Sequence, residues 1–136
     1  MPDFVCRPLL KHQKDVESLR NALIWQVKHG KKVFGLGTDT AYHAPEKKYC
    51  ECGACGVFTA PIALELYAMA FDQIGIINHL SVFACDVMPE FYSVKNSLPA
   101  KTVILKKEPQ QVKESYYGAK TPFAGQVIPW TATVVD

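Results

Sequence analysis

Apolar residues recur at intervals of three and four between residues 11 and 29, and this period predicts an amphipathic helix. The recurring positions are Val16, Leu19, Leu23 and Val27. Gly30 follows directly, where a glycine commonly ends a helix because it adopts a left-handed backbone without strain. The apolar face of this helix is expected to cover a sheet.

A continuous apolar run, residues 33–36, follows the helix and predicts a strand buried on both faces, as in parallel sheets. Polar side chains that could carry chemistry follow the end of the run, since Asp39 and His43 come soon after Gly37. In α/β folds the carboxyl ends of the strands carry catalytic groups, since the sheet holds the backbone while the next loop meets the substrate. Asp39 and His43 are therefore the first candidates for a site.

Two further helical patterns occupy the middle of the chain. Pro61 suits the first turn of a helix, and the spacing of Ile62, Leu66 and Met69 continues it. Gly75 predicts a break. Residues 76–87 then predict a second, largely buried helix that ends or restarts at Pro89.

Two β-prone runs, residues 102–105 and 126–135, predict two or three short strands near the end of the sequence. Pro129 lies within the second run and cannot donate a ladder hydrogen bond, which indicates an edge strand. The pattern contains one convincing buried parallel strand, or two if residues 4–6 form another. We therefore expect an α/β fold that does not close a complete (β/α)8 barrel, which takes roughly 250 residues.

Composition excludes several classes of function. The net charge is +2, with no basic cluster of the kind that binds nucleic acid or an anionic membrane. No apolar segment is long enough to span a membrane, and the N-terminus lacks the basic region and apolar core of a signal peptide. Five cysteines, an odd number, favour reduced thiols in a cytoplasmic protein over a disulfide framework.

Three stretches together resemble one enzyme family. Residues 36–44 read Leu-Gly-Thr-Asp-Thr-Ala-Tyr-His-Ala, the spacing Cys50-x-Cys52-x-x-Cys55 follows, and residues 58–61 read Phe-Thr-Ala-Pro. This order resembles the last barrel strand and its loop in dihydroorotase of the homodimeric bacterial type. The resemblance runs from residue 6 to the tail at Trp130 and covers the family's C-terminal part.

The resemblance implies the C-terminal segment of a (β/α)8 TIM-barrel amidohydrolase, with residues 1–136 as a single partial domain. Residues 1–100 would form the barrel end and the helices, and residues 101–136 the short strands and the tail. The implied reaction is the reversible cyclisation of N-carbamoyl-L-aspartate to L-dihydroorotate in de novo pyrimidine biosynthesis. The complete family enzyme is a homodimer and holds two zinc ions in each active site.

By the same resemblance, Asp39 is a zinc ligand and the catalytic base. Two cations about 3.5–4 Å apart polarise the amide oxygen and keep a hydroxide available near neutral pH. A carboxylate beside that hydroxide is a short proton shuttle to the leaving nitrogen. The simpler alternative is an aspartate that only caps the following turn through its own backbone.

The resemblance also implies three substrate contacts. His43 would hydrogen-bond the substrate carboxylate, and the backbone groups of Arg7 and Gly53 would contact the ring. An ungapped alignment of the loop assigns its contact to Cys55 instead. Tyr42 stands where the family has a proline, which changes the local support of His43.

A different class of function stays open: a non-catalytic zinc-binding or interaction module built on Cys50, Cys52 and Cys55, since thiolates at such spacing can bind one metal ion. Reduced, peripheral cysteines are the simpler interpretation of the same pattern. The neighbouring pair Lys47 and Lys48 is expected to be solvated.

The other metal ligands of the family have no counterpart here, because the sequence contains no His-x-His. We therefore expect the isolated chain to be inactive. Apolar residues between positions 4 and 36 would leave an uncovered surface that favours association. The expected partners are a second copy of the chain or a complementary N-terminal segment. A relic that only packs against or regulates a full-length relative is a third possibility.

Overall fold

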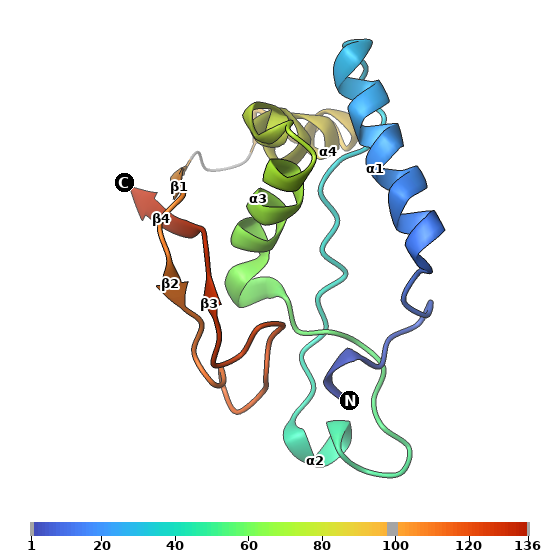
Figure 1. Ribbon diagram of the computed structural model, residues 1–136, viewed down its shortest axis with the longest axis vertical. Coiled ribbons are helices and arrows are strands. Elements are labelled where there is room, and N and C mark those ends of the chain that lie inside the picture. The colour runs from blue at the N-terminus through green and yellow to red at the C-terminus, as the bar shows by residue number, and fades with distance from the viewer. Residues whose placement is uncertain (1, 98–100, 136) are drawn as a thin grey trace. The chain divides into compact units, whose positions relative to one another are not determined.

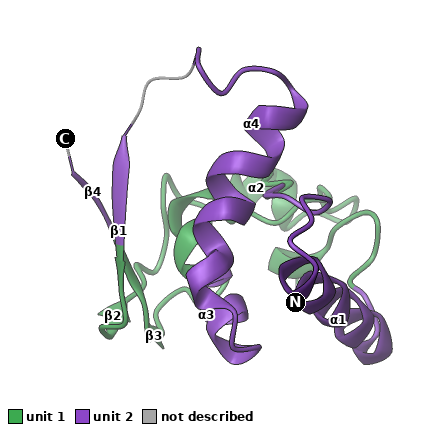
Figure 2. Cartoon of the chain, turned by 90° about the horizontal axis from the view of Figure 1, so that it is seen from above, with its two compact units in different colours: residues 1–10, 38–65, 105–132 green, residues 11–37, 66–104, 133–136 purple. Residues whose placement is uncertain are grey.

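The computed structural model describes residues 2–97 and 101–135, and the predicted division at residue 100 falls outside them. In this part of the chain four α-helices precede four short strands (Figure 1). Two compact units form from interleaved segments (Figure 2). Unit 1 comprises Met1–Leu10, Thr38–Glu65 and Leu105–Ala132, and unit 2 comprises Lys11–Gly37, Leu66–Ile104 and Thr133–Asp136.

Helix α1 (Gln13–Lys28) opens unit 2 and confirms the first periodic pattern. It ends in the expected glycine cap: Gly30 has a φ of +58°, its N–H donates to Val27 O, and the N–H of Lys31 donates to Gln26 O. These two bonds satisfy carbonyls that the helix end leaves free. The apolar face is only partly covered, since Leu19 and Trp25 are exposed.

The predicted strand at residues 33–36 is wrong for the described chain. These residues pair with no strand, and Val33 is 61% exposed. A strand forms only by pairing with a neighbouring strand, and the described residues supply none. The buried side chain of Gln26 takes that place in part: its Oε1 accepts from the N–H of Val33 (2.7 Å) and of Phe34 (2.6 Å), and its Nε2 donates to Phe34 O (3.0 Å).

Helix α3 (Ala63–Gln73) confirms the second helical pattern and follows a short 3-10 turn, Ala60–Ile62. Its end repeats the glycine cap of α1. Gly75 has a φ of +72°, its N–H donates to Asp72 O, and the N–H of Ile76 donates to Phe71 O. Unit 2 gathers its core around this helix and the next segment: Ala68, Phe71, Ile76, Leu80, Phe83 and Val87 are buried.

Residues 76–87 are helical but not uniformly so. A 3-10 turn, Ile77–His79, comes first, a π-helical segment, Val82–Asp86, follows, and α4 (Val87–Phe91) completes the run. Pro89 lies inside α4. A proline lacks the N–H that Cys85 O, four residues earlier, would accept, and its ring crowds that carbonyl. A wider turn before the proline accommodates both effects.

The described residues form four short strands, paired two by two, where the sequence predicted two or three. In unit 1, β2 (Gln110–Gln111) pairs antiparallel with β3 (Val127–Ile128), Gln110 opposite Ile128. A second two-stranded sheet joins β1 (Thr102–Lys106) and β4 (Thr131–Val135). Pro129 separates β3 from β4. The core of unit 1 consists of Ile62, Val112, Ala119, Ile128 and Trp130.

Candidate active site

Asp39 stands in an uncommon backbone conformation with its carboxylate uncommitted. Its φ is +44°, a left-handed value that Asp tolerates better than most residues but that is uncommon outside glycine. The side chain is exposed, and none of the described residues bonds its carboxylate. The turn that follows uses Thr38 instead, whose Oγ1 accepts from the N–H of Thr40 (3.4 Å). Asp39 therefore does not cap its own turn here and is open to an external ligand or proton.

Thr40 ties the segment after Asp39 to the start of the helical region at residue 60. Its Oγ1 accepts from the N–H of Thr59 (3.0 Å) and of Ala60 (2.9 Å), donors that a helix N-terminus leaves unsatisfied. A parallel bridge to Val57 and a bond from the N–H of Ala41 to Val57 O (3.0 Å) reinforce the link. Sequence reasoning missed this role because the capping group lies about twenty residues before the helix.

His43 is half-buried against the cysteine-rich loop. Its Nε2 donates to Cys55 O at 2.9 Å, so that nitrogen carries a proton. The close approach requires Gly56: its φ is +143°, and a Cβ there would collide with Ala41 Cβ and lie 3.1 Å from His43 Nε2. The other ring nitrogen, Nδ1, has no partner among the described residues. It is the atom that remains for a ligand.

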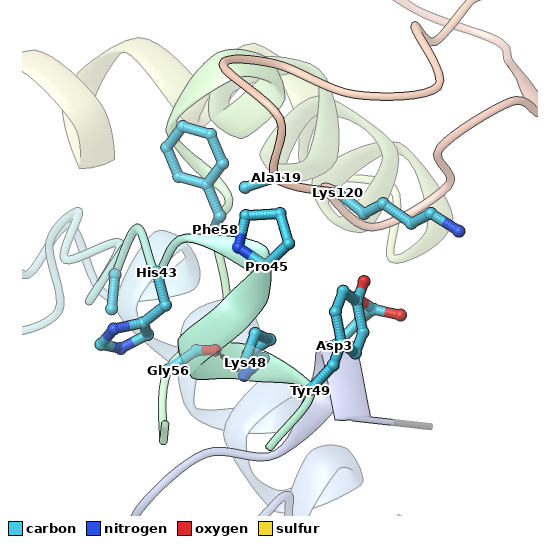
Figure 3. A pocket seen from close by; sticks show the side chains of 10 residues that line it. Asp3, His43, Pro45, Lys48, Tyr49, Gly56, Phe58, Ala119 and Lys120 are labelled. Carbon is cyan, nitrogen blue, oxygen red and sulfur yellow. Dashed lines mark hydrogen bonds between the residues drawn. The ribbon is translucent and has the colours of Figure 1, made fainter. Parts of the chain in front are cut away.

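Lys48 corrects the expectation of a solvated pair. It ends the four-residue helix α2 (Pro45–Lys48), only 8% of its surface is exposed, and its Nζ donates to three backbone carbonyls. The acceptors are Val5 O (3.1 Å), Ala54 O (3.0 Å) and Gly56 O (2.6 Å). Figure 3 shows Lys48 and His43 close to Gly56. Lys47, its neighbour, is exposed as expected.

Arg7 and Gly53, two of the predicted contacts, line one depression of about 520 Å³ in unit 1. Cys6 and the three loop cysteines line it as well. His43 lines a separate, much smaller cavity of about 10 Å³ (Figure 3), room for about one water molecule. Asp39 lines neither space. The structure thus brings Arg7, Gly53 and Cys55 together and leaves Asp39 and His43 apart from that depression.

Several amides of the loop are bonded within the described chain, and others are free. The N–H groups of Gly53, Ala54 and Gly56 donate to Cys50 O (3.0 Å), Lys47 O (2.9 Å) and Val5 O (2.8 Å). Cys55 N–H, by contrast, donates to no acceptor among the described residues. The N–H groups of Cys50, Glu51 and Cys52 also lack an acceptor among the described residues, so Cys55 N–H is one of the donors that this loop offers to a bound molecule.

Two tyrosines brace the same region. Tyr42, at the family's proline position, donates from its hydroxyl to Tyr117 O (3.0 Å) and packs edge-on against Phe58. Tyr49 donates to Asp3 Oδ1, and this bond, together with burial and the Asp3 charge, raises the pKa of Tyr49. Both tyrosine hydroxyls are therefore bonded to other segments of unit 1.

No group of three or more His, Cys, Asp or Glu side chains that could hold a metal ion occurs among residues 2–97 and 101–135. All five cysteines are free thiols, and Cys50, Cys52 and Cys55 are exposed. Neither the zinc module nor a complete two-zinc centre fits this donor set. Asp39 could supply at most one ligand of such a centre.

Comparison with known proteins links the chain to one family of enzymes. No family model matches it. The chain is 43% identical over 133 residues to a dihydroorotase of Shewanella amazonensis, and 37% identical over 133 residues to a mitochondrial dihydroorotase of Arabidopsis thaliana. Each match covers 95% of this chain but only 37% and 34% of the respective relative. The chain thus spans about a third of the length of these relatives.

Solved structures agree with the sequence matches. Dihydroorotase of Saccharomyces cerevisiae in complex with 5-fluoroorotic acid superposes with a TM-score of 0.86 at 26% identity, over 98% of this chain and 38% of that one. Dihydroorotase of Campylobacter jejuni gives 0.69 at 25% identity, over 97% of this chain and 37% of that one. The chain is therefore related to the dihydroorotases in both sequence and fold.

Proposed function

We propose that this chain corresponds to the C-terminal third of a TIM-barrel dihydroorotase and supplies part of the active site for the reversible cyclisation of N-carbamoyl-L-aspartate to L-dihydroorotate. The observation that carries the proposal is Asp39. Its carboxylate is exposed and unpartnered, on a left-handed backbone, within a chain related to dihydroorotases over 95% of its length. A structural aspartate would instead be bonded to the turn beside it.

Asp39 is assigned the proton transfers. In the hydrolytic direction a water molecule attacks the ring amide carbon, and an Asp39 carboxylate oxygen takes the proton that this water loses. The same oxygen then delivers the proton to the ring nitrogen as its bond to carbon breaks. Acid–base catalysis by a positioned carboxylate contributes about 10²- to 10⁴-fold.

The two zinc ions of the family would require more ligands than the described residues supply. Asp39 is proposed as one ligand. When bound, the metal ions would supply Lewis acidity and an activated water. With only one candidate ligand here, the isolated chain is proposed to be inactive.

Two groups are proposed to bind the substrate. His43 would meet the substrate carboxylate through Nδ1, since its Nε2 is bonded to Cys55 O. This contact requires a proton on Nδ1 and therefore an imidazolium. The backbone of Arg7 and of Gly53 would line the ring site, and the free N–H of Cys55 makes Cys55 the better donor to the ring than Gly53, whose own N–H is bonded to Cys50 O.

The test of the function is a chimaera. This chain replaces the matching region of the Shewanella amazonensis relative, to which it is 43% identical. The chimaera is expected to convert dihydroorotate to carbamoyl aspartate, measured by loss of ultraviolet absorbance, whereas the isolated chain shows no turnover. A folded, zinc-loaded chimaera without activity would contradict the proposal.

We further propose that uncovered apolar surface drives association of the isolated chain. In unit 1, Leu9 is 77% and Leu10 67% exposed, and in unit 2, Val33 is 61% and Leu19 54% exposed. The partner would be a second copy, or an N-terminal segment that completes a barrel. The complete enzyme is proposed to be a homodimer, as the family resemblance implies.

Association is measurable by sedimentation velocity. The chain is expected to sediment above monomer mass at micromolar concentration, because burying apolar surface contributes about 25 cal/mol per Å². The double variant Leu9→Lys, Val33→Lys is expected to shift the distribution toward monomer. The control is Tyr117→Lys, which changes an exposed aromatic residue outside residues 4–36. A monodisperse wild-type monomer would argue against association.

The compartment is proposed to be the cytoplasm. Free thiols at all five cysteines are usual in a reducing compartment. None of the helices among the described residues has both the length and the apolar character needed to cross a membrane.

A further inference from the structure

The cysteine-rich loop of unit 1 lacks regular structure, and a buried ammonium group organises its backbone. We propose that Lys48 is a positioning residue: by binding the carbonyls of Ala54 and Gly56, it fixes the orientation of the free N–H of Cys55, a residue that lines the ligand depression. The assignment of a ligand to that depression rests on the proposed function. The positioning of the loop by Lys48 does not.

The burial of Lys48 demands complete hydrogen bonding. An ammonium group withdrawn from water is costly unless its protons find acceptors. Lys48 is 8% exposed, and its three N–H donors meet three carbonyls at 2.6–3.1 Å. The salt bridges of the described residues involve Lys32 and Lys95. Carbonyl dipoles, rather than a carboxylate, therefore compensate the charge of Lys48.

The three acceptors join two distant segments. Val5 lies near the start of the chain, whereas Ala54 and Gly56 belong to the loop. Val5 O also accepts from the N–H of Gly56 at 2.8 Å. The ammonium thus fastens the loop to the segment around Val5 at the point where those two backbones already meet.

Peptide geometry explains how Lys48 aims Cys55. The C=O of Ala54 and the N–H of Cys55 belong to one planar trans peptide group and point in opposite directions. With Ala54 O held by Lys48, the N–H of Cys55 must point away from the ammonium. The next carbonyl, Cys55 O, is held by His43, and Gly56 O is again held by Lys48. Three successive carbonyls are thus oriented by two side chains.

The first experiment measures amide hydrogen exchange in the 136-residue chain. Lys48→Met keeps the length of the side chain but removes the donors, and it is expected to speed exchange at the Gly56 amide about 100-fold, because bonds to a charged donor hold the local structure closed. Lys47→Met is the matched control and should leave Gly56 unchanged. A folded Lys48→Met chain with unchanged exchange at Gly56 would overturn the proposal.

Chemical rescue separates the hydrogen bonds from the space that the side chain fills. In Lys48→Ala, n-propylammonium restores the missing ammonium and is expected to slow Gly56 exchange again, while tetramethylammonium, which has no N–H donor, does not. If Lys48→Met fails to fold, the Lys48→Arg variant tests whether a cationic hydrogen-bond donor at this position is sufficient to hold the loop. A folded Lys48→Arg chain with a protected Gly56 amide supports a donor role, and an unfolded one contradicts it.

The second experiment uses the active chimaera. A misaimed Cys55 N–H weakens binding of the ring in substrate and transition state alike, so Lys48→Met is expected to raise KM for dihydroorotate about tenfold while kcat stays within about twofold. An unchanged KM, or a loss confined to kcat, would overturn the link to the ligand. If the unmutated chimaera is inactive, the proposed function fails, and the exchange measurements still decide the positioning role of Lys48.

Discussion

Asp39→Asn in the chimaera is expected to lower kcat by about 10²- to 10⁴-fold, the range of acid–base catalysis by a positioned side chain. The substitution removes the proton acceptor but keeps the size of the side chain. Asparagine also tolerates the left-handed backbone at this position, where φ is +44°. The comparison therefore isolates the carboxylate from the fold. Steady-state turnover of dihydroorotate is the measurement.

The control for Asp39→Asn is Glu46→Gln, which removes an exposed carboxylate from α2 in the same unit and should leave turnover unchanged. In the isolated chain, Asp39→Asn should leave the thermal midpoint unchanged, because the carboxylate makes no bond within the described residues. Near-normal turnover with intact metal content would refute the assignment. A large drop in thermal midpoint would favour a structural role instead.

Gly56→Ala is expected to destabilise the isolated chain by roughly 2–5 kcal/mol, the sum of backbone strain and overpacking. The φ of +143° is poorly accessible to alanine, and the new methyl group would meet Ala41 Cβ and His43 Nε2. The neighbour atoms are not flexible chain ends, so relief requires movement of the backbone or loss of the His43–Cys55 bond. Urea denaturation followed by circular dichroism measures the change.

Gly37→Ala is the matched control for this prediction. A Cβ at Gly37 would meet no atom within 4 Å, and its expected effect is below about 1 kcal/mol. Equal losses in the two variants would show that the crowding at Gly56 is not specific. A stable Gly56→Ala chain would remove the steric basis for the close contact of His43 with the loop.

The helices were predictable because their determinants are local. The period of α1, the period of α3 and the glycines that end both helices act within a few residues, since each helical hydrogen bond spans four positions. The candidate catalytic group was also visible in the sequence, because Asp39 directly follows a glycine-rich segment. The β-prone run at residues 126–135 was also visible, although it was expected as an edge strand containing Pro129, whereas the structure has two strands separated by that proline.

Residues 33–36 show where local pattern fails. Their apolar run indicates a strand, but a strand forms only when another backbone presents complementary donors and acceptors. No such partner exists among the described residues, and the side chain of Gln26 bonds to that backbone instead. An apolar run thus indicates that a segment can form a buried strand, but a strand forms only where a neighbouring strand is present to pair with it.

The sequence by itself determined the two long helices, α1 and α3, and the glycines that end them, because these properties depend on neighbours in the chain. Only the tertiary structure decided that Lys48 is buried, that Cys55 rather than Gly53 has a free N–H, and that the three loop cysteines form no metal cluster among the described residues. These outcomes depend on contacts such as Lys48 with Val5, which join residues far apart in sequence. Residue spacing carries no information about such distant pairs.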